Sequence, residues 1–283
     1  MNHTGALTLL GMVCGLAVEA ADKSQYNFFN PTPRELMREM STDRPDRTES
    51  AYTVDAGHYQ IEMDVFSYAV DHYNGVPGDH RAEALAIAPI NIKAGLLNNV
   101  DLQLVVLPYV SLREHNVAAR TVEENRGFGD VIPRLKINLW GNDGGPTALA
   151  VMPFVKLPTN TGDVGNNSVE GGLIVPFAVS LPHEWSMTLM TQLIIARDEF
   201  GGGHHADFVN SVAVGRGIVG DLSGYVEFFS LVIAESNRDW VGTFDCGLTY
   251  MLTEDIQLDG GVNIGVTRSA PDFNPFLGLS WRF

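Results

Sequence analysis

The dominant feature of the chain is an alternation of apolar and polar side chains that starts near residue 57 and continues to the C-terminus. In YQIEMDVFSY, the side chains of Tyr59, Ile61, Met63 and Val65 share one face, with glutamine, glutamate and aspartate on the other. The same pattern recurs in VDLQLVV at 100–106, VIPRLKINLW at 131–140, WSMTLMTQL at 185–193, TFDCGLTY at 243–250 and DIQLDGGVNIGV at 255–266. A period of two predicts strands with one apolar face, whereas a helix repeats every 3.6 residues.

The strands predicted in this way number about 12, and the connections between them alternate in length. The predicted strands are 57–71, 80–96, 100–114, 127–140, 146–157, 169–180, 184–197, 205–217, 221–234, 239–251, 254–267 and 275–283. Longer loops are expected at 72–79, 115–126, 158–168, 198–204, 235–238 and 268–274. Short turns separate the other pairs, with the sequences LLNN, GNDGG, LPHE, IVGD and LTED. An even strand count with short and long connections in turn is typical of an outer-membrane barrel with periplasmic turns and longer external loops.

The predicted fold class is therefore all-β, an antiparallel up-and-down transmembrane β-barrel. A tilted strand spans a bilayer with roughly 9–11 residues, which the predicted strands reach or exceed. Unpaired backbone groups are costly in hydrocarbon, so strands span a membrane only in a closed barrel. The apolar face then contacts outer-membrane lipid and the polar face lines the lumen.

Alternation also assigns ionisable side chains to the lumen. The candidates are Glu62, Asp64, Lys93, Asp101, Arg134, Lys136, Glu227, Asp245, Asp259 and Arg282. They either wall a polar path for a small solute or pair with one another and stabilise a narrow or plugged barrel. Twelve strands lie between the side-chain-filled barrels of eight and the open porins of sixteen or more.

Two segments precede the barrel, which is expected at 57–283. The apolar run Ala6–Val18 is too short to span a bilayer, and small residues flank Glu19, so 1–20 is predicted to be a secretory signal peptide. A short buried strand or helix is the alternative. Residues 21–56 form a polar periplasmic segment in which STDRPDRTES, at 41–50, carries charges of both signs. Its charged residues are candidates for a plug that pairs with the lumen: Asp43, Arg44, Asp46, Arg47 and Glu49.

Charge and cysteine content narrow the range of partners. The formal net charge is -16, with 34 acidic and 18 basic residues, so the surface repels phosphate backbones and nucleic-acid binding is not expected. Removal of the signal would leave Cys246 as the single cysteine, which excludes an intramolecular disulfide. The chain ends in GLSWRF, and the aromatic Phe283 on a final amphipathic strand looks like the tail by which barrels meet the barrel assembly machinery.

Three blocks of sequence resemble one family. The first holds Thr42-Asp43-Arg44-Pro45, Thr48-Glu49-Ser50, Tyr52-Thr53-Val54 and Gly57-His58-Tyr59-Gln60-Ile61-Glu62. The others are GFGDVIPRLKINLWG at 127–141 and LPTNTGDVGNNSVEGGLIVPF at 157–177. They are similar to the family named for the MetA pathway of phenol degradation, whose members are called transporters. The resemblance covers most of the chain beyond the signal and implies an outer-membrane β-barrel, but it specifies the solute only weakly.

Neither a metal site nor a catalytic site is expected. His204 and His205 lie near Asp198 and Asp207, but adjacent histidines in a strand point opposite ways and no third ligand is fixed by spacing. The polar stretch 159–167 lacks the bidentate acid of a calcium loop. There is no Gly-x-Ser-x-Gly element, and the histidines fall in the signal, turns, loops and strand ends, away from any mid-strand serine. We therefore expect a non-enzyme without a cofactor.

The function expected from these patterns is passive passage of a small, aromatic or apolar solute across the bacterial outer membrane. The solute would diffuse along the lumen or leave laterally through the wall. The alternative is a structural or adhesive barrel with a closed lumen, whose external loops 115–126 and 158–168 contact a partner. A soluble β-sandwich is a third interpretation.

Overall fold

The computed structural model describes residues 22–72, 80–116, 119–199, 202–235 and 239–283. The predicted signal peptide at 1–20 and most of the predicted loop 72–79 lie outside this range. The described chain contains one short 3-10 helix and fifteen strand segments. These are η1 (Arg34–Leu36), β1 (Tyr59–Asp71), β2 (His80–Ile87), β3 (Ile90–Leu97), β4 (Val100–Val106), β5 (Tyr109–Asn116), β6 (Thr121–Gly127), β7 (Ile132–Trp140), β8 (Thr147–Lys156), β9 (Glu170–Ser180), β10 (Trp185–Arg197), β11 (His204–Val219), β12 (Leu222–Ile233), β13 (Asp239–Thr253), β14 (Ile256–Gly265) and β15 (Phe273–Arg282).

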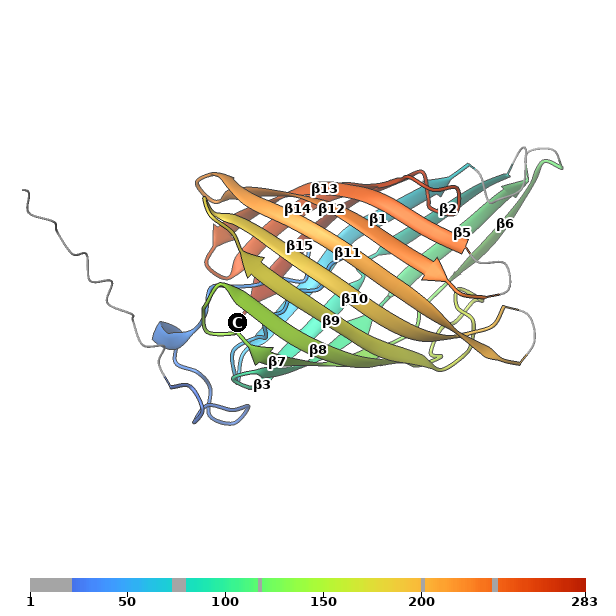
Figure 1. Cartoon of the computed structure of the whole chain (residues 1–283). Helices are drawn as coiled ribbons and strands as arrows, with labels where there is room; N and C mark the ends of the chain where they lie inside the picture. Colours follow the sequence, from blue (N-terminus) through green and yellow to red (C-terminus); the bar gives the residue numbers. More distant parts are fainter. Residues whose placement is uncertain (1–21, 73–79, 117–118, 200–201, 236–238) are drawn as a thin grey trace, which may run out of the picture.

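The segments form one closed antiparallel sheet, so the predicted barrel is confirmed (Figure 1). Every strand from β7 to β15 pairs with the next, and β15 pairs with β1 to close the ring. The first strand pairs with β3 near one end and with β2 near the other, because β2 and β3 are two halves of one barrel strand. Likewise β4 continues as β5 and β6 as β7, which gives a closed barrel of 12 strands.

Three neighbouring strands are interrupted, which the sequence pattern did not predict. The breaks lie at Ala88-Pro89, at Leu107-Pro108 and at 128–131. Proline has no N–H to donate to a sheet ladder. The carbonyl of Pro89 instead accepts from Asp64, where β1 has a bulge, and the carbonyl of Leu107 accepts from Gly129. The predicted continuous strands 80–96 and 100–114 are therefore wrong at these points.

The predicted long loop 115–126 is also wrong, because its first two residues belong to β5 and its second half to β6. This segment pairs with β5 from Gly127 to Thr121, and the β5–β6 hairpin projects past the rest of the wall beside β2 (Figure 1). The loop 158–168 lies against the base of β6, where Thr161 donates its main-chain N–H to Phe128 and accepts one from it on its hydroxyl.

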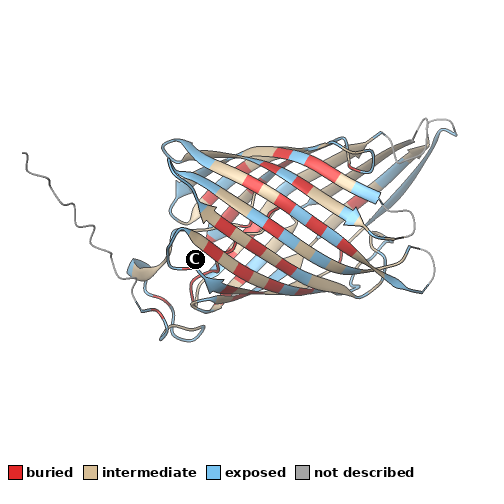
Figure 2. Ribbon diagram, viewed as in Figure 1, coloured by how far each residue is buried: buried red, intermediate tan, exposed pale blue. Residues whose placement is uncertain are grey.

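The wall is apolar outside and polar inside. Buried and exposed positions alternate along most strands (Figure 2). Leu102, Leu248 and Trp281 are among the exposed apolar side chains, while Gln103, Lys136 and Asp245 are fully buried. No helix in the described part of the chain is long and apolar enough to cross a membrane.

The segment before β1 occupies the short-turn end of the barrel and continues into it (Figure 1). Ala51 and Ala56 are completely buried, and Ala51 packs on small side chains of the wall that include Ala148 and Ala150. The small residues on both sides allow the backbone of the segment to lie directly on the sheet. Both the segment and Phe283 lie at this end, where Tyr59 and Phe283 exchange main-chain hydrogen bonds.

Candidate functional site

The candidate site is the lumen together with the segment that crosses it, residues 41–50, which we call the lumen segment. Asp43 is its anchor on the wall formed by β1, β3 and β7. The carboxylate of Asp43 accepts from Lys136 at 2.6 Å and forms an ion pair with Lys93, and its main-chain N–H donates to Glu62 at 3.0 Å. Lys93 also pairs with Glu62. Three predicted lumen residues therefore meet one residue of the predicted plug.

Two more contacts fix the lumen segment and its continuation to the same side of the barrel. Glu49 forms an ion pair with Arg134 on β7. Asp101 on β4 accepts the main-chain N–H of Val54 at 3.0 Å and also a hydrogen bond from Gln103. One carboxylate comes from the lumen segment and the other from the wall, and each has a partner across the contact, so paired groups occupy this side of the lumen.

Arg44 points to β1 and β14, next to the wall that Asp43 contacts, whereas Arg47 points to β12 on the opposite side of the barrel. The guanidinium of Arg44 pairs with Asp64 on β1 and with Asp259 on β14, both at 2.6 Å. The main-chain N–H of Arg47 donates to Glu227 at 2.8 Å, and its guanidinium lies 3.6 Å from the centre of the Phe229 ring. Such a cation–π contact adds to the ion pairs in holding the segment across the lumen.

The remaining predicted residues differ in their surroundings. Asp245 on β13 accepts from Thr243 and lies near the charge of Arg47. Arg282 on β15 pairs with Asp255 at 2.8 Å and donates to the carbonyl of Arg38, so it holds the chain before the lumen segment. Of the ten lumen candidates, Arg282 is thus placed at the short-turn end, apart from the central cluster.

Asp46 is the member of the lumen segment whose charge is least compensated. Its position deep inside the barrel and the negative charge of Glu227 raise its pKa well above the usual value of 3.8. Asp43 shows the opposite behaviour, because the charges of Lys136 and Lys93 outweigh the effect of burial and lower its pKa. The lumen segment is therefore held in place, or docked, more strongly when Asp43 is charged and when Asp46 is protonated.

Successive cavities follow the lumen segment, the first two on the side of β10–β14 and the third beside β14, β15 and β1. A vestibule of about 1040 Å³ at the short-turn end is lined by Arg38, Glu184 and Arg282 among others. It shares Met40, Glu184 and Ser223 with a cavity of about 320 Å³. Beyond Arg44, Pro45 and Asp46, which line both, lies a smaller cavity of about 170 Å³.

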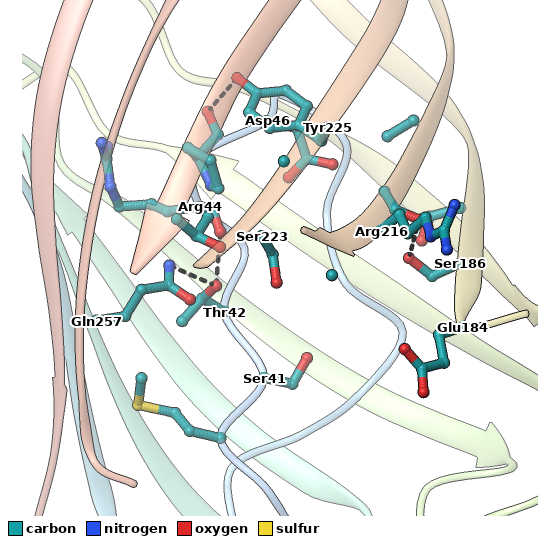
Figure 3. A pocket seen from close by; sticks show the side chains of 18 residues that line it. Ser41, Thr42, Arg44, Asp46, Glu184, Ser186, Arg216, Ser223, Tyr225 and Gln257 are labelled. Atoms are coloured by element: carbon teal, nitrogen blue, oxygen red, sulfur yellow. Dashed lines mark hydrogen bonds between the residues drawn. The ribbon is translucent and has the colours of Figure 1, made fainter. Parts of the chain in front are cut away.

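The middle cavity is polar. Thr42, Arg44 and Asp46 of the lumen segment face Tyr225 and Gln257 of the wall across it (Figure 3). Gln257 donates to the hydroxyl of Thr42, and the Tyr225 hydroxyl lies 3.5 Å from the carbonyl oxygen of Pro45. Glycine and alanine positions of β11 and β12 complete the lining and leave space where side chains would otherwise fill the lumen.

Sequence reasoning missed the uncharged polar residues that complete the site. Gln60 donates to Glu62, Asn138 donates to the carbonyl of Ala51, and Thr48 shares a hydrogen bond with Ser211. The inward wall positions among them follow from the same alternation that identified the charged residues. No sequence pattern identifies Thr48, because apolar and polar residues do not alternate in the lumen segment.

Comparison with solved structures places this architecture among outer-membrane barrels. The COG4313 outer membrane channel from Pseudomonas putida F1 superposes with a TM-score of 0.65 and 14% identity, over 86% of this chain and 100% of that one. The transport unit of the autotransporter AIDA-I from Escherichia coli follows with a TM-score of 0.51 and 11% identity, over 86% and 93% of the chains. The fold is therefore that of a closed β-barrel similar to outer-membrane channel structures.

Residues 42–283 match the family described as "Putative MetA-pathway of phenol degradation". The chain belongs to this family, and the resemblance seen in the three sequence blocks is confirmed. The search of curated proteins found no match. At 14% and 11% identity, the structural neighbours bear on the fold alone.

Proposed function

We propose that the protein is a passive channel of the bacterial outer membrane for small aromatic solutes that carry polar groups. The observation that carries this proposal is the series of cavities beside Arg44, Pro45 and Asp46 inside a closed wall. Cavities that bind small molecules measure about 300–1,000 Å³, a range that includes the middle cavity and nearly reaches the size of the vestibule. No residue of the cavities forms a recognised catalytic set, which supports a channel in preference to an enzyme.

The lining of the middle cavity suggests the solute class. Tyr225 and Pro45 present apolar surface, while Thr42, Gln257 and the guanidinium of Arg44 present hydrogen-bonding groups. Ion pairs with Asp64 and Asp259 balance the charge of Arg44. A ring with hydroxyl or carboxylate substituents matches both kinds of surface. The name of the family agrees with an aromatic solute.

The lumen segment is proposed to act as a plug that narrows this route. Its contacts bridge opposite walls, from Lys93 and Lys136 to Glu227, and therefore obstruct the centre of the barrel. Solutes would pass between the segment and the β10–β14 wall. The lateral exit expected from the sequence would lie at the interrupted strands, on the other side.

Liposome swelling tests the solute class. Purified full-length protein is reconstituted, and swelling is compared in hydroxybenzoates, sugars and amino acids of similar size. We expect faster swelling in the aromatic solutes, and Tyr225→Ala should reduce the preference. Equal exclusion of all solutes would contradict the proposal and favour a closed structural barrel.

Single-channel recording tests the plug. Deletion of residues 41–50 should raise the conductance severalfold, because the space that the lumen segment fills would join the cavities beside it. A deletion of the same length in the loop 158–168 serves as the control. An unchanged conductance after the first deletion would contradict the plug while leaving the solute preference to the swelling assay.

A further inference from the structure

The long-loop end of the barrel carries a cluster of ligating side chains outside the lumen site. Asp198 follows β10, His205 lies at the start of β11, and Glu235 follows β12. Nδ1 of His205 is 2.9 Å from Oδ1 of Asp198 and 4.0 Å from Oε2 of Glu235. One ligand atom from each of the three residues lies within 4.8 Å of the other two. Adjacent strands thus bring together three groups that are far apart in sequence.

A fourth residue, Asp207, lies on the other side of the imidazole. His205 and Asp207 are two positions apart on one strand, so their side chains share a face. Oδ1 of Asp207 lies 3.2 Å from Nε2 of His205. Asp207 is only 8% exposed, and among the described residues this imidazole nitrogen is the sole partner of its Oδ1, which it satisfies only when Nε2 carries a proton. A buried acceptor is costly when unsatisfied, which requires an explanation at this position.

We propose that Nδ1 of His205, with the carboxylates of Asp198 and Glu235, binds a divalent transition-metal ion such as Zn²⁺. With Nδ1 on the metal, the ring proton must lie on Nε2, where Oδ1 of Asp207 is placed to accept it. Metal-binding histidines regularly donate their second ring N–H to a carboxylate in this way. One proposal therefore accounts for both the three converging ligands and the buried oxygen of Asp207.

The chemistry of the donors selects the class of ion. Calcium and magnesium take oxygen ligands, whereas imidazole nitrogen with carboxylate oxygen suits zinc and related ions. Water would complete the coordination. Asp198 and Glu235 have side-chain exposures of 24% and 20%, so the ion would reach the site from solvent.

Arg197, next to Asp198, has hydrogen bonds to two other parts of the chain. The guanidinium of Arg197 donates to the carbonyl of Gly202 at 3.1 Å, and its main-chain N–H donates to Glu170. Spacing alone could not reveal this site, because Glu235 comes from the end of another strand. The effect of the ion would be to join the connection after β10 to the connection after β12.

Isothermal titration calorimetry tests the proposal on the full-length barrel in detergent, purified without a polyhistidine tag and treated with chelator. Zinc chloride should bind with one ion per chain. His205→Ala and Glu235→Gln should weaken binding by more than tenfold, and Asp207→Asn by about 10–100-fold. His204→Ala is the matched control, since the imidazole of His204 is next in sequence but is not part of the cluster.

Heat-modifiable gel migration provides the second measurement. Zinc should raise the temperature at which the wild-type barrel unfolds and leave that of Glu235→Gln unchanged, while both proteins migrate as folded barrels before heating. Absence of zinc and manganese binding would overturn the proposal and leave His205 as a cation paired with three carboxylates. Binding that persists in His205→Ala but is lost in His204→Ala would overturn it equally.

Discussion

At the scale of single residues, Asp43 joins the lumen segment to the wall. Its carboxylate pairs with two lysines, and its main-chain N–H donates a hydrogen bond to the carboxylate of Glu62. Removing one member of a buried charged network leaves the others uncompensated, which costs about 3–5 kcal/mol. The lumen segment is not a strand of the sheet, so this cost should appear as release of the segment and not as unfolding of the barrel.

Asp43→Asn should therefore shift the ratio of docked to released segment by about a hundredfold or more, since each 1.4 kcal/mol is about tenfold. Limited trypsin digestion in detergent measures the release, because Arg38 and Arg47 become cleavable when the segment leaves, whereas the Arg44–Pro45 bond resists trypsin. Glu35→Gln, an exposed change in η1, is the control. Cleavage of both variants at the wild-type rate would show that Asp43 does not anchor the segment.

Asp46 leads to a prediction on pH dependence. Its sign is opposite to that of Asp43, because the protonated form of Asp46 favours docking. Burial and the charge of Glu227 raise its pKa above 3.8 in the docked segment. The docked state therefore holds the proton more tightly than the released state, and docking weakens as the pH rises from about 4 through the raised pKa. Asp46→Asn removes this dependence and should favour the docked segment at neutral pH.

In planar bilayers, Asp46→Asn should lower the mean conductance at pH 7 relative to the wild type, and the two should converge near pH 4. Comparing the two proteins at each pH cancels the titration of the other carboxyls. A conductance of the variant that equals or exceeds the wild-type value at pH 7 would contradict the assignment of Asp46 as the uncompensated charge.

At the scale of elements, the contact between β3 and residues 54–57, which follow the lumen segment, depends on Gly95. A Cβ atom on Gly95 would lie 2.0 Å from the carbonyl oxygen of Asp55 and 2.8 Å from that of Val54. Both are backbone atoms, so the chain before β1 would have to move. The main-chain hydrogen bond from Gly57 to Gly95 lies in the same contact.

Gly95→Ala should therefore raise trypsin cleavage of the segment by at least tenfold while the barrel remains folded in heat-modifiable migration. Gly217→Ala is the matched control, because no atom lies within 4 Å of the Cβ it would add. Equal cleavage of the two variants would show that the close approach at Gly95 does not hold the segment.

The elements also show which parts of the fold can be predicted from sequence. Strands that lie between lipid and lumen have a period of two, so their existence and faces were predicted correctly. The segment β6 was missed because nearly all of TVEENRG is exposed on both faces, which removes the period. The breaks at Pro89 and Pro108 were missed because both prolines lie in uninterrupted apolar runs, ALAIAPI at 84–90 and LVVLPYV at 104–110. Only pairing with neighbouring strands shows the loss of ladder hydrogen bonds.

The candidate site was predictable to the same extent. Alternation identified the charged wall residues, and mixed charge identified the lumen segment. The pairing of Arg44 with Asp259 was not predictable, because it joins residues 215 positions apart through the path of an irregular segment. Spacing carries no information about such a path.

At the scale of the whole molecule, the polar core is what makes the lumen segment necessary. Most of the apolar side chains are turned outward here, and apart from an apolar cluster on β8–β12 the interior holds ionisable groups. These groups need partners, because an unpaired charge is costly in a confined space. The segment supplies those partners on two opposite walls, so the same residues stabilise the barrel and restrict its lumen.

The arrangement of the connections predicts the orientation of the barrel in the membrane. The short turns and both ends of the described chain lie at one end, which in outer-membrane barrels faces the periplasm. Ala119, at the tip of the β5–β6 hairpin, and Glu254, in the turn before β14, are both exposed and mark the two ends. In a Cys246→Ala background, Ala119→Cys should react with a membrane-impermeant maleimide on intact cells.

Glu254→Cys should react only after the outer membrane has been made permeable, since its turn faces the periplasm in this orientation. The Cys246→Ala protein without a new cysteine provides the blank. The reverse labelling pattern would mean that the long loops face inward, and the vestibule beside Arg282 would then open to the outside. Solutes entering the cell would in that case meet the wide cavity first and the lumen segment last.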